Sequence, residues 1–89
     1  MIYIREIKPS CKKAIDKATR KNPLLRKIIE NKIEEILLNP YHYKPLSYDL
    51  AGERRVHIMK SQVLKFRIDE QNKIITFIFF GHHDEAFKR

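Results

Sequence analysis

Two side chains that could act on a phosphodiester alternate with apolar ones in the run Arg55-Val56-His57-Ile58, and a further imidazole, His83, lies near the end of the sequence. Alternation with a period of two is typical of a β-strand, whose successive side chains point to opposite faces. We therefore expect Arg55 and His57 on one face and Val56 and Ile58 on the other. His83 follows a glycine by two residues, at a point where the chain can leave the sheet and expose the ring.

Arginine and two histidines together suit the cleavage of RNA without a metal ion. The reaction needs a base for the 2′-hydroxyl proton, a cation for the crowded phosphorane and an acid for the leaving 5′-oxygen. The pKa of histidine lies near neutrality, so His57 and His83 suit the two proton transfers. The guanidinium of Arg55 stays charged and its fork matches phosphate oxygens. A histidine on a strand is also commonly a surface residue or a hydrogen-bond partner, so spacing alone leaves both roles open.

The run His82-His83-Asp84-Glu85 contains residue types that bind metals. Adjacent residues of an extended chain point to opposite sides, so His82 and His83 are poorly placed to chelate one ion. No second ligand pair at a fixed spacing accompanies them. We expect no metal site and no cofactor, and we expect His42 to be exposed to solvent.

The elements that must position these residues follow from hydrophobic spacing. Apolar alternation predicts strands over residues 2–7, 54–59, 63–68 and 74–80. Helical spacing predicts one helix capped by Ser10 and ending near Lys21, and a second that starts with Asn22 as cap and Pro23 and ends at Asn39. Turns are expected at residues 61–62 and 70–72. The fold class is predicted as α+β: an N-terminal strand, an antiparallel two-helix hairpin and a three-stranded antiparallel meander form a four-stranded sheet, in one domain over residues 1–89.

The last predicted strand is apolar on both sides, which places it inside the sheet with the helices on one face. Strict alternation puts Ile75, Phe77 and Phe79 on one side and Ile74, Ile78 and Phe80 on the other. The opposite face of the sheet is then free to present basic side chains in a groove. Residues 41–53 are expected to form a loop anchored by Leu46 and Leu50. Its tyrosines either pack on the helices or stack on bases; they are Tyr41, Tyr43 and Tyr48.

Composition narrows the function. Nineteen Lys and Arg residues against eleven Asp and Glu residues give a net charge of +8, which favours nucleic acid or an acidic protein as partner, or simply keeps a small protein soluble. The single cysteine, Cys11, favours a reducing compartment and is expected to pack in the core. The longest apolar run is too short to span a bilayer and no signal peptide is evident, so a cytoplasmic location without membrane contact is predicted.

Three motifs, together with the order of the elements, resemble the RelE/ParE superfamily of bacterial and archaeal toxins over nearly the whole chain. They are LAGERRV at residues 50–56, LKFRID at residues 64–69 and FFGHHDEAF at residues 79–87. The resemblance implies the RelE/ParE-like microbial RNase fold. It also implies a ribosome-dependent endoribonuclease (mRNA interferase) that cuts mRNA in the decoding site. Such toxins are inhibited by a co-expressed acidic RelB-like antitoxin, in some cases within a toxin–antitoxin heterotetramer.

The resemblance also implies roles for residues. In RelE-like members two basic residues on one face of the second strand line the active site, and Arg55 and His57 match them. His83 matches the catalytic basic residue that follows the glycine of the last strand. The ending is similar to the YafQ branch, in which a histidine and a phenylalanine four residues later serve catalysis, and this carries over to His83 and Phe87. Further RNA contacts are expected from basic residues along the same face and tail: Lys60, Lys65 and Arg89.

The sequence departs from the family at two places. Several members have an arginine where this chain has Val63, and no late tyrosine is present unless Phe87 replaces it by stacking on a base. Two other functions stay open. One is a ParE-like inhibitor of DNA gyrase without nuclease chemistry, against which the retained histidines argue. The other is an inactive toxin-fold protein that acts with its antitoxin as a DNA-binding complex.

Overall fold

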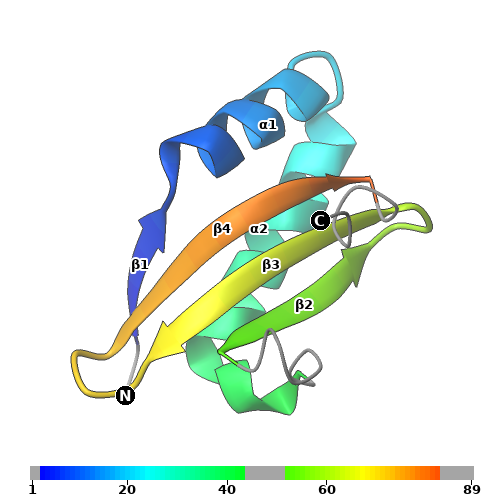
Figure 1. Cartoon of the computed structure of the whole chain (residues 1–89). Coiled ribbons are helices and arrows are strands. Elements are labelled where there is room, and N and C mark those ends of the chain that lie inside the picture. The colour runs from blue at the N-terminus through cyan, green and yellow to red at the C-terminus, as the bar shows by residue number, and fades with distance from the viewer. Residues whose placement is uncertain (1–2, 44–51, 83–89) are drawn as a thin grey trace.

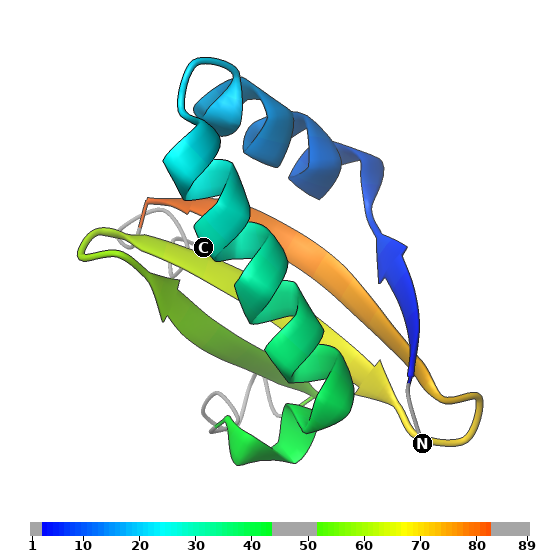
Figure 2. The same cartoon turned by 180° about the vertical axis from the view of Figure 1, so that it is seen from behind.

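A computed structural model of the chain describes residues 3–43 and 52–82, which form a four-stranded sheet with two helices on one of its faces (Figures 1 and 2). The predicted α+β architecture is confirmed. In chain order the elements are β1 (Ile4–Ile7), α1 (Pro9–Thr19), α2 (Pro23–Leu38), the 3₁₀ helix η1 (Pro40–His42), β2 (Glu53–Ile58), β3 (Gln62–Asp69) and β4 (Ile74–His82).

The strands lie in the order β1-β4-β3-β2. β3 is antiparallel to both β2 and β4, so the predicted meander is confirmed. β1 joins the other side of β4 in parallel, with Ile4 opposite Ile74. The long connection that a parallel pair requires contains the two helices, η1, β2 and β3. β4 is therefore an inner strand, as its two apolar faces predict.

A β-bulge in β4 changes which of its side chains face the helices. Lys65 is opposite Phe79 and Phe66 is opposite Phe77, so Ile78 is an extra residue with no partner on β3. The predicted alternation through β4 is wrong beyond this point. Phe80 joins Phe77 on the helix side, where it is buried in the core, and Phe79 turns to the opposite face. Bulges of this kind bend a strand and re-aim the residues that follow.

The helix boundaries are partly as predicted. α1 begins at Pro9 and its cap position is Lys8, so the assignment of Ser10 as cap is wrong. Proline suits a first helical position because its fixed φ matches the helix and its missing N–H would be unpaired there. α1 also ends earlier than predicted, at Thr19. For α2 the prediction is confirmed, since the Asn22 side chain accepts a 3.0 Å hydrogen bond from the Leu25 N–H.

The core lies between the helices and one face of the sheet. Phe66 and Phe77 lie at its centre with ring centroids 6.0 Å apart, and the Tyr43 ring meets Phe66 edge-on at 6.0 Å. Cys11 is buried among these residues, as predicted. The buried members of the core are Cys11, Ile15, Leu25, Ile29, Ile33, Ile36, Leu37, Val56, Ile58, Leu64, Phe66, Ile75, Phe77 and Phe80.

Some predicted features lie outside the described residues. These include the start of the first strand at residue 2 and the loop anchors Leu46 and Leu50, together with Tyr48. The described part of the predicted 41–53 loop instead contains the end of η1, and β2 starts already at Glu53. None of the helices within residues 3–43 and 52–82 is long and apolar enough to cross a membrane.

Candidate functional site on the open face of the sheet

The face of the sheet that points away from the helices, here called the open face, carries the predicted basic residues of β2. Val56 and Ile58 are 9% and 1% exposed and belong to the helix-side core. Arg55 and His57 alternate with them and therefore share the open face, as predicted. His57 is exposed and Arg55 half-buried.

Strand register extends this pair into two rows across the sheet. Arg55 lies opposite Lys65, which in turn lies opposite Phe79. In the next row His57 lies opposite Val63, and Val63 lies opposite Gly81. Directly opposite residues in a sheet have their Cβ atoms about 4.5–5.5 Å apart, so each row is a set of neighbours. Val63 thus occupies the centre of the row that contains His57.

Lys65 is held in place by contacts on both sides. Its ammonium nitrogen lies 3.4 Å from Glu53 Oε1 and 5.6 Å from the centre of the Phe79 ring. The side chain is only 12% exposed. The structure therefore places this predicted RNA-binding cation beside Arg55, in a largely desolvated position where a carboxylate partly compensates its charge.

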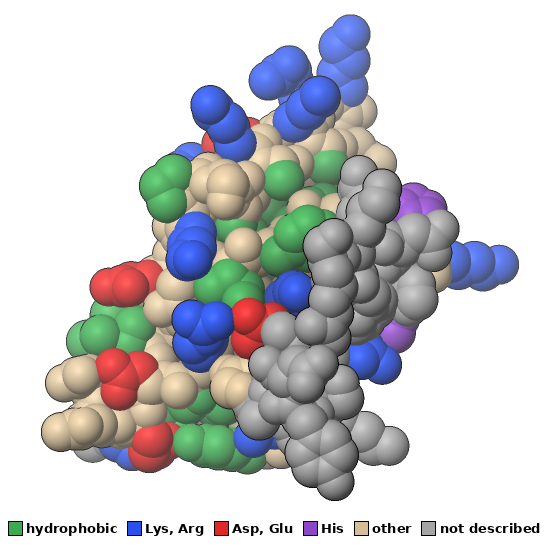
Figure 3. Space-filling model, viewed as in Figure 1, with side chains coloured by type: hydrophobic (Ala, Val, Ile, Leu, Met, Phe, Trp, Pro, Cys, Tyr) green, Lys and Arg blue, Asp and Glu red, His purple; other side chains and the backbone are tan. Residues whose placement is uncertain are grey.

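Glu53 is a residue of this face that the sequence analysis did not single out. Its carboxylate contacts Lys65 through Oε1 and Arg67 through Oε2, the latter at 2.9 Å, and its side chain is 14% exposed. Oε1 accepts no well-directed hydrogen bond, so its contact with Lys65 is an ion pair only. Figure 3 shows acidic atoms between basic side chains on this face. The signal was the parity of Glu53 with Arg55 and His57, but its two partners depend on the register of β3.

A pocket of about 270 Å³ opens at the free edge of β2. Its described lining residues are Tyr43, Arg55, Val56 and His57. It brings the two predicted catalytic side chains of β2 together with an aromatic ring from the end of η1. A concave surface with a guanidinium, an imidazole and a phenol suits a nucleotide, because the ring offers a stacking surface and the cation binds phosphate.

Tyr43 is fixed at this pocket by contacts with α2 and β2, in addition to its ring contact with Phe66 of β3. Its hydroxyl donates to Glu35 Oε1 of α2 at 3.3 Å, and its carbonyl oxygen accepts a 2.6 Å hydrogen bond from Arg54 Nη1 of β2. Burial and the Glu35 carboxylate raise the pKa of the Tyr43 hydroxyl, so it stays protonated at neutral pH. Tyr43 packs on the core, which confirms one of its two predicted roles. It also lines the pocket, so the other role, stacking on a base, stays a prediction.

The remaining candidates lie in the turn between β2 and β3 and in the C-terminal part of the chain. Lys60 is exposed in the turn between β2 and β3, and His82 lies opposite Gln62 at the end of β4. Gly81, two residues before His83, lies in the row of His57. His83, Phe87 and Arg89 themselves lie outside the described residues. The structure therefore brings Arg55 and His57 together and does not place the third predicted catalytic residue.

Two other sequence expectations can be compared with the described residues. Within residues 3–43 and 52–82, no group of three or more His, Cys, Asp or Glu side chains is arranged to hold a metal ion. His42 is exposed, as predicted, and its ring meets that of Tyr43 edge-on with centroids 5.1 Å apart.

Comparison with known proteins gives matches over almost the whole chain. Residues 6–87 match the model of a family described as the ParE toxin of type II toxin–antitoxin systems. A Methanocaldococcus jannaschii protein whose name, RelE4, places it among the RelE toxins is 44% identical over 88 residues, which is 99% of this chain and 94% of that protein. An uncharacterised protein of Methanosarcina mazei is 36% identical over 86 residues, covering 97% of this chain and all of that protein.

Solved structures share the fold at low sequence identity. A YoeB/ParE toxin from Agrobacterium tumefaciens superposes with a TM-score of 0.81 at 17% identity, covering 90% of this chain and 98% of that one. The toxin–antitoxin complex RelBE of Escherichia coli gives 0.73 at 17% identity over 90% and 95% of the two chains. YafQ of E. coli gives 0.68 at 18% identity over 97% and 99%. These likenesses show the fold that holds Arg55 and His57.

Proposed function

Because the chain belongs to the ParE toxin family of type II toxin–antitoxin systems, within the RelE/ParE superfamily, we propose that it inhibits translation as a ribosome-dependent mRNA interferase. The observation that carries the proposal is the placement of Arg55 and His57 on the open face, where both line one pocket with Tyr43. A guanidinium and an imidazole side by side are the groups that cleavage of RNA by its own 2′-hydroxyl needs.

In the proposed reaction an mRNA phosphate binds at Arg55, whose guanidinium stabilises the negative charge of the phosphorane. One of the two histidines removes the proton of the 2′-hydroxyl, and the 2′-oxygen attacks phosphorus. As this P–O bond forms, the bond from phosphorus to the 5′-oxygen breaks, and the other histidine gives a proton to that oxygen. The products are a 2′,3′-cyclic phosphate and a 5′-hydroxyl end. His57 and His83 fill these two roles, and Tyr43 or Phe87 stacks on a neighbouring base.

The other expected RNA contacts have different supports. Lys60 is exposed at the turn next to His57 and can reach a phosphate along the strand. Lys65 is largely desolvated beside Arg55, so it acts by raising the positive potential at the pocket. Phe87 and Arg89 are proposed from the family resemblance alone.

The proposed partners are the ribosome, mRNA and an acidic RelB-like antitoxin. The solved complexes RelBE and DinJ–YafQ of E. coli show toxins of this fold bound to antitoxins. The net charge of +8 of this chain suits an acidic partner. Leu24 and Leu38, each 66% exposed, offer apolar contacts on the helix hairpin. A toxin–antitoxin heterotetramer in the cytoplasm, where ribosomes are, is the assembly we propose.

Primer-extension mapping tests the nuclease. The purified chain is added to translating ribosomes, and we expect cuts in the mRNA at the A site. His57→Ala and Arg55→Gln should each slow cleavage by about a hundredfold or more. His42→Ala is the matched control, because His42 is an exposed histidine of η1 outside the pocket lining, and it should cleave at the normal rate. Equal activity of His57→Ala and His42→Ala would remove His57 from the mechanism.

A second candidate function, inhibition of DNA gyrase, is favoured by one observation. The matching family is described as ParE, the branch that the gyrase alternative names. Gyrase supercoiling and trapped gyrase–DNA complexes should be measured with the same preparations. If mRNA stayed intact and gyrase–DNA complexes were trapped, the chain would be a gyrase inhibitor and not an mRNA interferase.

A further inference from the structure

The positive charge of the chain is concentrated on α1 and not on the open face of the sheet. Residues 8–21 hold six basic residues and one acidic residue, a net charge of +5, and the other 75 residues contribute only +3. The basic members are Lys8, Lys12, Lys13, Lys17, Arg20 and Lys21. Figure 3 shows the basic side chains standing out from the end of the molecule where Figure 1 draws α1.

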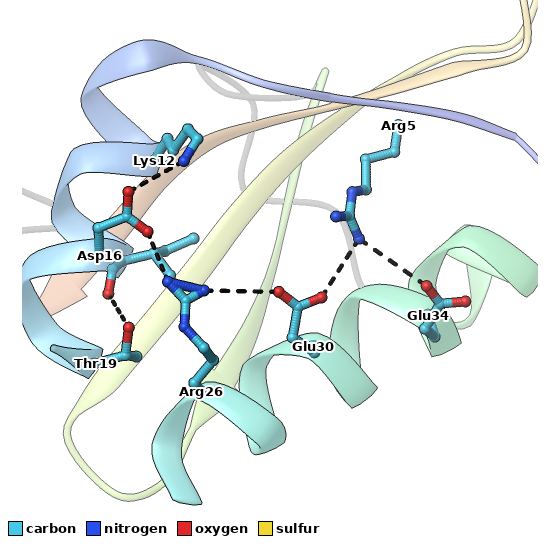
Figure 4. Close-up of polar contacts among 8 residues, drawn as sticks. Arg5, Lys12, Asp16, Thr19, Arg26, Glu30 and Glu34 are labelled. Carbon is cyan, nitrogen blue, oxygen red and sulfur yellow. Dashed lines mark hydrogen bonds and ion pairs between the residues drawn. The ribbon is translucent and has the colours of Figure 1, made fainter. Parts of the chain in front are cut away.

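The one acidic residue of this segment does not offset that charge. Asp16 lies 3.1 Å from Lys12 Nζ and 2.8 Å from Arg26 Nη2 (Figure 4). The contact with Lys12 and the charge of Arg26 lower the pKa of the Asp16 carboxyl. From Arg26 the network continues along α2 to Glu30, and Arg5 of β1 contacts the same glutamate at 3.6 Å. The side of the hairpin that faces β1 is therefore balanced, and the excess lies elsewhere on α1.

The excess forms a line along the exposed side of α1, here called the α1 stripe: Lys13, Lys17, Arg20 and Lys21. Lys13, Lys17 and Lys21 repeat every four residues, about 6 Å apart along a helix axis, with Lys21 in the turn that follows. The buried residues of α1, Cys11, Ile15 and Thr19, repeat with the same spacing two residues out of phase, which is the opposite side. All four stripe residues are exposed, and none has an ion pair to an acidic residue in the described part of the chain.

From this arrangement we infer a second nucleic-acid site: the α1 stripe binds the phosphate backbone of a folded RNA stem. It goes beyond the proposed cleavage function, because α1 packs on the helix side of the sheet and Arg55 and His57 lie on the open face of β2. A regular row of cations, three of them lysines, that includes no aromatic ring and has no ion pair among the described residues is suited to phosphates and not to sequence. One molecule can then hold a structured RNA with α1 while a single strand occupies the open face.

An acidic protein segment is the competing occupant of the α1 stripe. Lys17 also lines an apolar pocket of about 410 Å³ with Ala14, Ala18 and Phe80, and an amphipathic helix could use both. RNA is favoured because the other three members lie outside the described lining of that pocket. They therefore offer charge at positions that do not adjoin this apolar pocket.

Binding of a labelled RNA hairpin with a fully paired stem tests the inference, by fluorescence anisotropy over a range of salt concentrations. Lys13→Gln with Lys17→Gln should weaken binding by roughly tenfold and lower the slope of log K against log salt by about two. The matched control is Lys27→Gln with Lys32→Gln on α2, which removes the same charge from a helix whose charges are balanced. It should change the affinity by less than about threefold and leave the slope unchanged.

Three further readings complete the test. Lys13→Arg with Lys17→Arg keeps the charge and should restore binding, and circular dichroism should show the same helix content for all variants. Equal losses in the stripe and control variants would overturn the inference, because net charge alone would then explain binding. So would a polyglutamate peptide that binds the α1 stripe more tightly than the RNA stem. The assay contains no ribosome, so absence of mRNA cleavage leaves its result intact.

Discussion

Glu53 lies directly opposite Arg67 in the β2–β3 ladder, and its carboxylate contacts Arg67 through one oxygen and Lys65 through the other. Lys65 in turn lies opposite Arg55. A single carboxylate at the start of β2 therefore sets the electrostatics beneath the proposed phosphate site. Without it, two cations of β3 and one of β2 would face one another across neighbouring positions.

Removal of the Glu53 charge should destabilise the fold more than removal of its exposed partner. Glu53→Gln removes the carboxylate beside the ammonium of Lys65, whose side chain is only 12% exposed, and we expect the free energy of unfolding to fall by about 1–3 kcal/mol. Arg67→Gln should cost less than about 1 kcal/mol, because the Arg67 side chain is 54% exposed. Urea unfolding followed by circular dichroism measures both. Equal small losses would show that the contact with Lys65 is not stabilising.

The bulge at Ile78 predicts losses of stability of different size for substitutions at two adjacent phenylalanines. Phe80 is 4% exposed in the core, so Phe80→Ala should lower the free energy of unfolding by about 3–5 kcal/mol. Phe79 lies on the open face under Lys65, and Phe79→Ala should cost about half as much or less. Chemical denaturation of the two variants gives the comparison. If Phe79→Ala lost more free energy of unfolding than Phe80→Ala, uninterrupted alternation along β4 would be supported and the bulge contradicted.

Acid should weaken a contact that joins three segments at one end of the sheet. Glu70 Oε1 accepts hydrogen bonds from the hydroxyls of Tyr3 and Tyr41, each at 2.7 Å, and Lys73 contacts Oε2. Lys73 first, and then the two tyrosines, lower the pKa of Glu70 to about 2. The unfolded value is about 4.3. A lowered pKa stabilises the folded state fully above about pH 4.3, and this contribution is lost as pH falls toward 2.

Glu70→Gln should therefore be less stable than the wild type at neutral pH, and the difference should shrink as pH falls through this window. Urea midpoints between pH 2 and 7 measure it, and the effect is small because Glu70 is exposed. Tyr41→Phe removes one donor and should reduce the same pH dependence in part. If the difference in urea midpoint between Glu70→Gln and the wild type stayed constant down to pH 2, Glu70 would not contribute to the loss of stability in acid.

Local patterns in the sequence predicted the elements because hydrophobic period and proline position are local signals. The alternation around Arg55 and His57 correctly put both on the open face, and Asn22-Pro23 marked the start of α2. Ser10 misled because a serine cap and a proline at the first helical position are competing start signals, and here Pro9 prevails. The bulge could not be predicted, since an extra residue in β4 leaves composition and hydrophobicity unchanged.

The site was less predictable than the fold because it depends on register. We expected a turn at residues 61–62, but the turn occupies residues 59–61 and pairs Ile58 with Gln62. Met59 adopts a φ of 60° there. This left-handed conformation is usually adopted by glycine or asparagine, and their presence in a sequence would have indicated the turn. Because no such residue marks the turn, the pairing of Lys65 with Arg55 could not be predicted from the sequence, and neither could the role of Glu53.

The parallel pairing of β1 with β4 has a consequence for synthesis. Ile4 of β1 pairs with Ile74 of β4. The sheet of a newly made chain therefore stays incomplete until β4 has left the ribosomal exit tunnel. The open face is built on that same strand through Phe79 and Gly81. The open face is therefore complete only once β4 has paired with β1 on one side and with β3 on the other.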